Sequence, residues 1–330
     1  MHWERQPGRY PRDPRLGHRP GISYIPTRGE NETLKDLYTN QEGFVCLKDE
    51  PYEEIDWRSE RLIVILGGSV AMGLGASCNR KTSAALLQSW LNEKPGKTYQ
   101  VVNAACGAHC SWQELIRFTM EISDRRPWMV FSISSWNDFI HSAIGCRDTR
   151  MWHKNHDRSI DDLSEILVTG RARKKNSLAN KAKKAILRLR GKRFSEGEIQ
   201  WGYHNCEFTP REHAADNYIH NMNQLKAITR SLGGEFKCLL QPQVLMNPSE
   251  DRKSNKAEQD ILRLEANHEG FKHARQVFYS RLDKRKEKGF IQDLGYYESE
   301  KFIDHCHLND EGQVQLAKRL LEEVLASANT

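Results

Sequence analysis

The chain has 330 residues, of which 38% are hydrophobic, and its 50 Lys and Arg exceed its 44 Asp and Glu by a net charge of +6. This length suffices for one large α/β domain or two small ones, and the apolar content supports a buried core. A membrane-spanning protein is excluded, because no stretch approaches the roughly 20 apolar residues that a bilayer requires. The first twenty residues carry charges and prolines where an export signal has an apolar core, so we expect a cytoplasmic location, at most peripheral to a membrane.

The first 60 residues are rich in Pro, Gly and Arg and show little helical periodicity. We expect residues 1–60 to form an extended arm that packs on the following domain, and we call this segment the arm. The first strong strand is expected at 61–66, because RLIVIL is the continuous apolar run typical of a buried parallel strand.

Strand and helix patterns then alternate along the chain. Further strands are expected at 100–104, 128–134, 236–241 and 290–294, and helices at 82–91, 112–122, 215–232 and 316–325. Such alternation implies right-handed crossovers and a sheet covered on both faces. The sequence therefore predicts an α/β fold for 61–330, a three-layer α/β/α sandwich with a mostly parallel, flavodoxin-like sheet of five strands.

A basic insertion at about 147–198 interrupts this alternation. Its segment 171–193 holds eleven Lys and Arg and no acid. A solvated surface helix, a lid over the site, contact with an anionic glycan and docking to anionic lipid are all consistent with this composition. We expect no nucleic-acid partner, because no recognised module and no interleaved aromatic residues accompany the charge.

Chemistry-bearing residues follow the expected strands at the points where the strands end. The first strand leads to Ser69, the second to Gly107, and the third to Asn137, while Asp304 and His307 lie in the loop before the last helix. In an open parallel sheet the reactive site lies beyond the carboxyl ends of the strands. A hydroxyl, a glycine amide, a carboxamide and an Asp/His pair are the parts of an acyl-transfer site.

These four blocks resemble those of the SGNH, or GDSL-like, hydrolases over about residues 61–325. The shared features are Ser69 followed four residues later by Gly, a Gly after the second strand, Asn-Asp after the third, and D-x-x-H-L near the C-terminus. Two segments of the arm, GHRP at 17–20 and NQEGF at 40–44, resemble the lead-in of bacterial members often found with polysaccharide-modification genes. The chain departs from the family at Gly68, where the G-D-S pattern has Asp, and in S-S-W-N-D, where G-x-N-D is usual.

The resemblance implies a role for each residue of the site. Ser69 would be the nucleophile, His307 its general base, and Asp304 the group that orients His307 and stabilises its charged form. The oxyanion hole would combine the backbone N–H groups of Ser69 and Gly107 with the side-chain amide of Asn137.

Two more residues are weaker candidates for substrate binding. Trp136 stands in the third block, which departs from the family pattern, and it would reshape the wall of a substrate pocket. Asn103 would brace the oxyanion loop or simply close the second strand.

Other kinds of site fit the sequence less well. The stretch GGSVAMGLGAS lacks the G-K-[ST] ending of a P-loop, and Cys78 stands near where a third dinucleotide-binding glycine is needed. The segment 67–71 lacks the final Gly of the G-x-S-x-G elbow of α/β-hydrolases.

Histidine and cysteine spacings do not predict a metal site. Neither the 305–307 stretch nor His153 with His156 provides three or four ligands at a zinc spacing, and we expect His305 to be exposed on a loop. The eight cysteines include no C-x-x-C pair, so we expect reduced thiols, with Cys106 and Cys110 in structural positions. No metal or organic cofactor is implied.

The expected function is that of a serine esterase. It would remove small acyl groups, such as acetyl, from a small-molecule or glycan ester, through an acyl-Ser69 intermediate. One alternative is an O-acyltransferase with the same triad. Another is a catalytically silent protein that binds glycans or a membrane surface.

Overall fold

The structure is a computed structural model, which describes most of the chain outside the basic insertion. The described residues are 37–51, 53–93, 98–143, 208–246, 265–286 and 289–328, with Asp13, Leu16, Arg19, Gly96 and Leu262. The expected insertion at 147–198, including 171–193, His153 and His156, lies outside the described residues.

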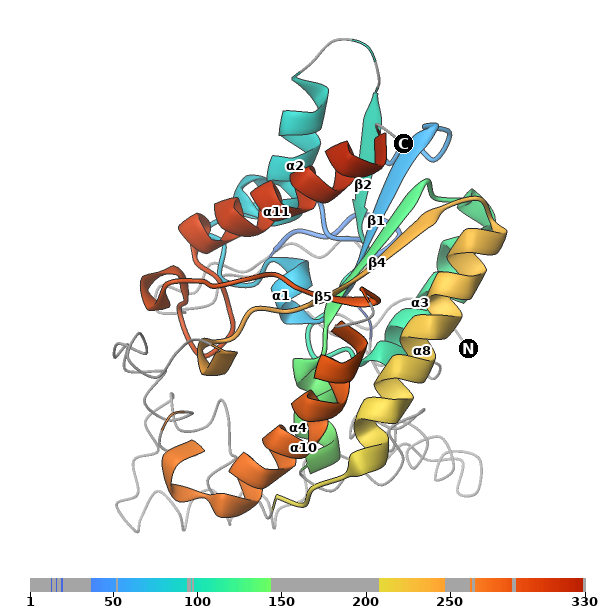
Figure 1. Ribbon diagram of the computed structural model, residues 1–330. Coiled ribbons are helices and arrows are strands. Elements are labelled where there is room, and N and C mark those ends of the chain that lie inside the picture. Colours follow the sequence, from blue (N-terminus) through green and yellow to red (C-terminus); the bar gives the residue numbers. More distant parts are fainter. Residues whose placement is uncertain are drawn as a thin grey trace, which may run out of the picture.

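Five parallel strands form one sheet at the centre of the described part of the chain (Figure 1). The strands are β1 (Arg61–Gly67), β2 (Tyr99–Asn103), β3 (Met129–Ser134), β4 (Glu235–Leu240) and β5 (Ile291–Asp293). Their order is β2-β1-β3-β4-β5, and each neighbouring pair is parallel. The expected flavodoxin-like sheet is therefore confirmed, with strand bounds that differ from the expected ones by at most one residue.

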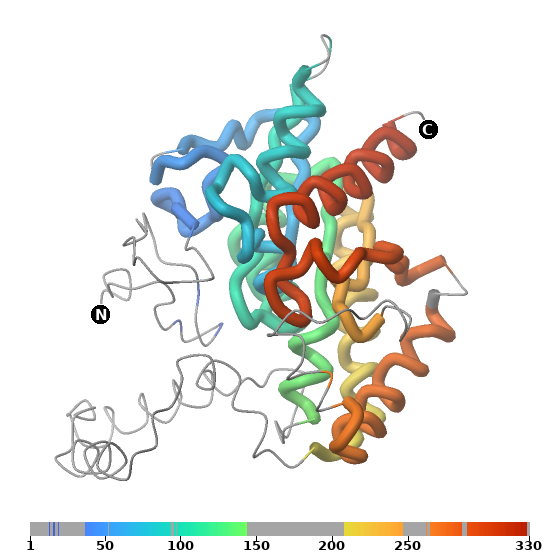
Figure 2. Tube along the Cα trace, turned by 90° about the vertical axis from the view of Figure 1, so that its left-hand side faces the viewer, coloured from blue at the N-terminus to red at the C-terminus, as the bar shows by residue number. Residues whose placement is uncertain are grey.

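Helices cover both faces of this sheet, as a three-layer sandwich requires. One face packs against α3 (Ser111–Glu121), α4 (Trp136–Ala143), α8 (Glu212–Ser231) and α10 (Glu269–Lys286). The other packs against α1 (Ser69–Met72), α2 (Ser83–Asn92) and α11 (Asp310–Ala328). Helices α2 and α11 lie side by side, as Figures 1 and 2 both show.

The sequence of β1 explains this layering. Successive side chains of a strand point to opposite faces. Leu62, Val64 and Leu66 accordingly belong to the hydrophobic cluster under α3 and α8, whereas Ile63 and Ile65 belong to the cluster under α2 and α11. All five are 0–1% exposed, so the continuous apolar run reflects burial on both faces.

Helices α4 and α10 are not expected from the sequence pattern, and α11 is longer than expected. The buried residues of α10 recur three and four positions apart, at Phe271, Ala274, Phe278 and Leu282. Charged residues crowd the positions between them and dilute the apolar signal. Helix α11 begins at Asp310, six residues before the expected start at 316. The sequence pattern misses this part because the first turn of the helix is polar.

The described part of the arm contacts the sheet through backbone and side-chain hydrogen bonds. Val45 forms an antiparallel bridge with Asn103 at the end of β2. The amide Nδ2 of Asn79 donates to the carbonyl oxygens of Tyr38 at 3.0 Å and of Cys46 at 2.7 Å. That the arm is a unit distinct from the domain at 61–330 stays a prediction.

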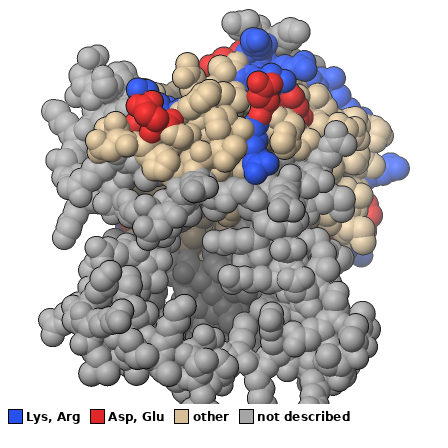
Figure 3. All heavy atoms as spheres, turned by 90° about the horizontal axis from the view of Figure 1, so that it is seen from below, with Lys and Arg blue, Asp and Glu red and all other residues tan. Residues whose placement is uncertain are grey.

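Two further expectations concern membrane-spanning helices and the state of the cysteines. Within the described ranges, no helix has the length and apolar character that crossing a bilayer requires. None of the six cysteines in the described part of the chain forms a disulfide, in agreement with reduced thiols. Where described residues are visible in Figure 3, Lys and Arg lie interspersed with Asp and Glu.

Candidate active site

Ser69 lies just beyond the carboxyl end of β1, in a turn whose conformation at position 67 requires glycine. Gly67 ends β1 with a φ of 141°, and a Cβ there would lie 2.2 Å from the carbonyl oxygen of Ile133. Gly68 is the N-cap of the short helix α1, and Ser69 is its first residue. The turn therefore places the Ser69 hydroxyl beyond the strand end.

Three side chains that are far apart in the sequence form a continuous hydrogen-bonded chain. His307 Nε2 lies 2.7 Å from Ser69 Oγ, and His307 Nδ1 lies 2.6 Å from Asp304 Oδ2. Asp304 Oδ1 also accepts hydrogen bonds from the backbone N–H groups of Cys306 and His307, at 2.9 and 2.8 Å. The structure thus brings together the three residues proposed from the sequence as a triad.

Burial and charge shift the pKa values of Asp304 and His307 in opposite directions. Burial alone would raise the pKa of Asp304, but the charge and hydrogen bond of His307 hold that pKa well below its usual range. Burial would lower the pKa of His307, but the Asp304 carboxylate raises it well above its usual value. Asp304 therefore favours the protonated form of His307.

The proposed oxyanion donors converge on the same strand ends. The backbone N–H of Cys106 donates to the carbonyl of Gly67 at 3.1 Å, which holds the segment 104–110, here called the Gly107 loop, beside the end of β1. Asn137 Nδ2 donates to the carbonyl of His109 at 2.8 Å. That nitrogen carries two hydrogens, and this hydrogen bond uses one of them.

Gly68 makes room for the Asn137 amide. A Cβ at position 68 would lie 2.5 Å from Asn137 Nδ2. The φ of Gly68 is −87°, a value that other residues adopt, so space and not backbone conformation requires glycine here. The departure from the G-D-S pattern is thus linked to the position of Asn137.

The third block holds α4 against α3 through a buried carboxylate. Asp138 accepts hydrogen bonds from the Ser111 hydroxyl at 2.6 Å and from the Ser111 backbone N–H at 3.0 Å. Burial raises the pKa of Asp138 to about 6, while these hydrogen bonds act to lower it. Because Ser111 begins α3 and Asp138 follows Asn137, this contact fixes two oxyanion segments relative to each other.

The two weaker candidates lie inside the protein. Asn103 Nδ2 donates to the carbonyls of Ala71 at 3.1 Å and Met72 at 3.3 Å, so the side chain ties the end of β2 to the helix that begins with Ser69. Trp136 is 2% exposed and packs among aromatic rings of the core, with its ring centroid 5.0 Å from that of His305. A direct role of either residue in substrate binding stays a prediction.

His305 is buried, and the expectation that it is exposed on a loop is wrong. Its ring packs against that of Trp136, and its backbone carbonyl accepts from the N–H of Val244, which follows β4, at 2.9 Å. Ligand atoms of Asp304, His305 and Cys306 lie within 4.8 Å of one another. Since both oxygens of Asp304 already accept hydrogen bonds from the 306–307 segment, a metal ion there would compete with the triad.

Two residues of α3 beside the Gly107 loop are not singled out by the sequence pattern. Gln113 Oε1 accepts from the backbone N–H of Cys110 at 2.9 Å, and Arg117 Nη1 donates to the carbonyl of Ala104 at 2.7 Å. Both side chains are buried, at 0% and 1% exposure. Polar residues four positions apart are typical of a solvated helix face, so the sequence carries no signal of this burial.

No protein-family model and no curated protein matches this sequence. Among solved structures, the chain is similar to TesA, with 15% identity over 79% of this chain and 97% of that chain and a TM-score of 0.40. It is similar to the psychrotrophic esterase EstA from Pseudoalteromonas sp., with 12% identity over 82% and 100% of the two chains and a TM-score of 0.42. A lipase/acylhydrolase from Enterococcus faecalis matches with 12% identity over 80% and 95% and a TM-score of 0.40. At these identities and scores the likenesses carry no weight for function.

The chain's own fold and site are consistent with the SGNH resemblance. The sheet has the expected strand order, and the Ser, Gly, Asn and Asp/His blocks lie at neighbouring strand ends. The architecture is a three-layer α/β/α sandwich with a parallel sheet of strand order β2-β1-β3-β4-β5.

Proposed function

We propose that this chain is a serine esterase that hydrolyses small acyl esters through an acyl-Ser69 intermediate. The observation that carries this proposal is the continuous contact from Ser69 Oγ through His307 to Asp304, at 2.7 and 2.6 Å. A serine hydroxyl is a weak nucleophile until a neighbouring base removes its proton. Here the base is within hydrogen-bond distance and is itself held by a carboxylate.

Acylation begins when Ser69 Oγ attacks the ester carbonyl and His307 Nε2 takes the hydroxyl proton. The imidazolium that results is stabilised by Asp304, whose carboxylate faces Nδ1. His307 then gives the proton to the leaving alcohol as the tetrahedral intermediate collapses.

Negative charge develops on the carbonyl oxygen in this step. The backbone N–H groups of Ser69 and Gly107 and the Asn137 amide are the donors proposed to bind it. Fixed donors stabilise such charge more than water does, and removing one typically reduces turnover by about 10²–10³-fold.

Deacylation uses the same groups in reverse. His307 activates a water molecule, which attacks the acyl carbon and releases the acid and free Ser69. We propose acetyl as the acyl group and a carbohydrate as the alcohol, on the resemblance of the arm segments 17–20 and 40–44 alone. With a sugar hydroxyl in place of water, the same triad would perform O-acyl transfer.

Steady-state hydrolysis of p-nitrophenyl acetate tests this function. We expect Ser69→Ala and His307→Ala each to reduce kcat by about 10³-fold or more relative to the wild type. Circular dichroism of each variant establishes that it is folded.

The matched control is Ser77→Ala, a serine on the same side of the sheet that binds Asp310 and not the triad. Its kcat should stay within about twofold of the wild type. Equal turnover in the wild type, Ser69→Ala and His307→Ala would reject the esterase proposal. Release of acetyl to an added sugar, faster than release to water, would instead support transfer.

A further inference from the structure

The Gly107 loop is held at both ends by one helix. Arg117 Nη1 donates to the carbonyl of Ala104, at the start of the loop, at 2.7 Å. Gln113 Oε1 accepts from the N–H of Cys110, at its end, at 2.9 Å. Gln113 and Arg117 are one turn apart on α3, so a single helix face brackets the segment that carries the proposed Gly107 donor.

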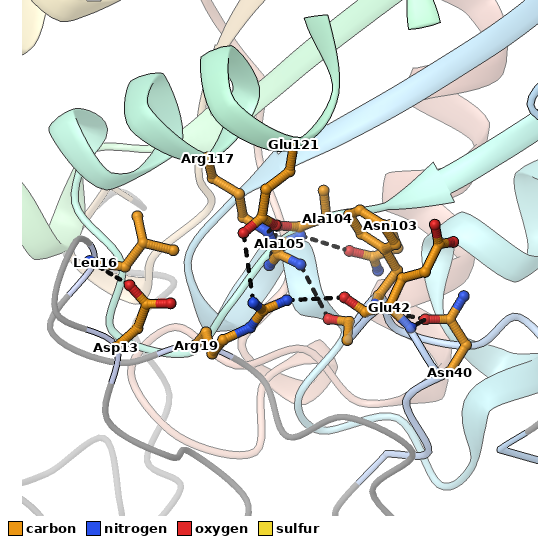
Figure 4. A network of polar contacts seen from close by, with 12 residues as sticks. Asp13, Leu16, Arg19, Asn40, Glu42, Asn103, Ala104, Ala105, Arg117 and Glu121 are labelled. Atoms are coloured by element: carbon orange, nitrogen blue, oxygen red, sulfur yellow. Dashed lines mark hydrogen bonds and ion pairs between the residues drawn. The ribbon is translucent and has the colours of Figure 1, made fainter. Parts of the chain in front are cut away.

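The same two side chains also bind the arm. Arg117 Nη2 donates to the carbonyl of Gly43 at 3.0 Å, and Gln113 Nε2 donates to the carbonyl of Leu16. Arg117 therefore binds the loop through Nη1 and the arm through Nη2. Gln113 binds the loop through Oε1 and the arm through Nε2. Figure 4 shows Arg117 between Ala104 and the arm.

Charged and aromatic contacts extend this connection. Arg117 Nε lies 3.3 Å from Glu121 Oε2, and its guanidinium carbon lies 5.0 Å from the ring centroid of Phe44. Glu121 Oε1 in turn lies 3.7 Å from Arg19 Nη1, while Arg19 Nη2 donates to the carbonyl of Glu42 at 2.9 Å (Figure 4). Arg19 thus links the arm residue Glu42 to Glu121 of α3, next to the contact between Gly43 and Arg117.

Packing alone does not require this arrangement. Arg117 is a guanidinium with 1% exposure, and burying a charge is costly unless it is paired and hydrogen-bonded. An apolar residue would fill the space under the arm without that cost. A planar group with several donors, however, is able to fix two carbonyls at once.

We propose that Gln113 and Arg117 are positioning residues that couple the arm to the Gly107 loop, so that the arm sets the geometry of the oxyanion hole. The effect on turnover rests on the proposed esterase function. The effect on the loop itself does not, and the two are measured separately.

The test compares Gln113→Ala, Arg117→Lys and Arg19→Ala with the wild type. Arg117→Lys keeps the charge but loses the planar guanidinium that donates to both carbonyls. Arg19→Ala removes the contacts of Arg19 with Glu42 of the arm and with Glu121 of α3, and leaves Gln113 and Arg117 unchanged. Hydrogen–deuterium exchange of the amides at 104–110 reports the loop directly. Kinetics with p-nitrophenyl acetate report turnover, and the matched control is Arg281→Lys, which loses a pair with Asp216 on α8.

We expect Gln113→Ala and Arg117→Lys to speed exchange at 104–110 about tenfold, and Arg19→Ala to speed it about threefold. We expect kcat to fall about tenfold or more in the two α3 variants, with KM within about twofold, because the donors act on the transition state. Arg281→Lys should change neither.

The coupling would be overturned if exchange at 104–110 stays at the wild-type rate in Arg19→Ala and in Gln113→Ala or Arg117→Lys, provided that the variant is folded. A lower melting temperature with unchanged kcat and KM would show a merely structural role and also overturn it. A wild type without turnover would reject the proposed function, whereas the exchange measurement would still decide the coupling.

Discussion

Gly68 and Asn137 form the residue-scale contact that most distinguishes this site from the G-D-S pattern. The Asn137 amide occupies the space that a side chain at position 68 would need, with Nδ2 2.5 Å from the Cβ position. Its hydrogen bond to the carbonyl of His109 keeps it there. The glycine at position 68, where the pattern has Asp, therefore leaves the space that the Asn137 amide occupies.

Restoring the family's residue is expected to harm the enzyme. Gly68→Asp, and also Gly68→Ala, should displace the Asn137 amide and reduce kcat by about 10²-fold, the effect of losing one oxyanion donor. Esterase kinetics in a double-mutant cycle with Asn137→Ala measure this. If Gly68→Ala reduces kcat as much in the Asn137→Ala background as in the wild type, the substitution does not act through Asn137.

The His307–Asp304 pair predicts a pH dependence. His307 acts as a base only when neutral, and Asp304 raises its pKa above the ordinary value of about 6.5, so wild-type kcat/KM should rise with pH through an apparent pKa above that value. Asp304→Asn removes the raising charge and leaves burial, which lowers the pKa. The acidic limb should move to lower pH while kcat falls roughly 10³–10⁴-fold. An acidic limb at the same pH in both proteins would contradict the assignment of His307 as the base.

Ser135 carries backbone strain at the end of β3. Its φ is 121°, in a region that favours glycine, and it stands where the family pattern G-x-N-D has Gly. Ser135→Gly should stabilise the fold by about 1 kcal/mol, and thermal unfolding should show a melting temperature about 2 °C higher. A lower melting temperature would mean that the hydroxyl contact with Tyr279, at 3.5 Å, outweighs the strain.

At the scale of elements, buried polar groups join α3 to β3 and α4. Glu114 of α3 accepts from the Ser132 hydroxyl of β3 at 2.5 Å, and Asp138 of α4 accepts from Ser111 of α3. Burial raises the pKa of Glu114 to about 7, and the hydrogen bond from Ser132 opposes this shift. The carboxyl group is thus held protonated at a pH where it would be ionised in the unfolded chain.

This network makes stability depend on pH in a defined direction. Between the unfolded pKa of about 4.3 and the folded pKa of about 7, the folded state holds a proton that the unfolded state has released, so stability falls as pH rises. Glu114→Gln replaces the titratable carboxyl group with an amide that does not titrate. Urea unfolding at pH 5 and pH 8 should show that the wild type loses more stability than the variant, by on the order of 1–3 kcal/mol. An equal loss in both proteins would contradict the raised pKa of Glu114.

At the scale of the whole molecule, the sequence predicts the sheet well. Strands such as 61–66 are buried on both faces and are therefore continuous apolar runs, which read clearly from sequence. Helix α10 is not recognisable from the sequence, because its four buried residues are separated by charged ones. Its burial depends on contacts with α8 and β5. Helix α4 is eight residues long, too short for a periodic signal.

The same contrast holds for the site. Ser69, Asp304 and His307 were predictable because each belongs to a short motif at a strand end or in the last loop. Burial of His305, and the contacts of Gln113 and Arg117 with the arm, were not predictable. They depend on which segments meet in space, across as many as 97 residues between Leu16 and Gln113.

The most direct test of the account is to identify the residue that carries the acyl group. The wild-type protein is mixed with p-nitrophenyl acetate, quenched in acid within the first turnovers and digested for mass spectrometry, with Ser69→Ala treated in parallel. We expect an added acetyl group on the wild-type peptide that contains Ser69, and none at that position in the variant. Hydrolysis that proceeds equally in Ser69→Ala, or a stable acetyl group on another residue of the active wild type, would contradict it.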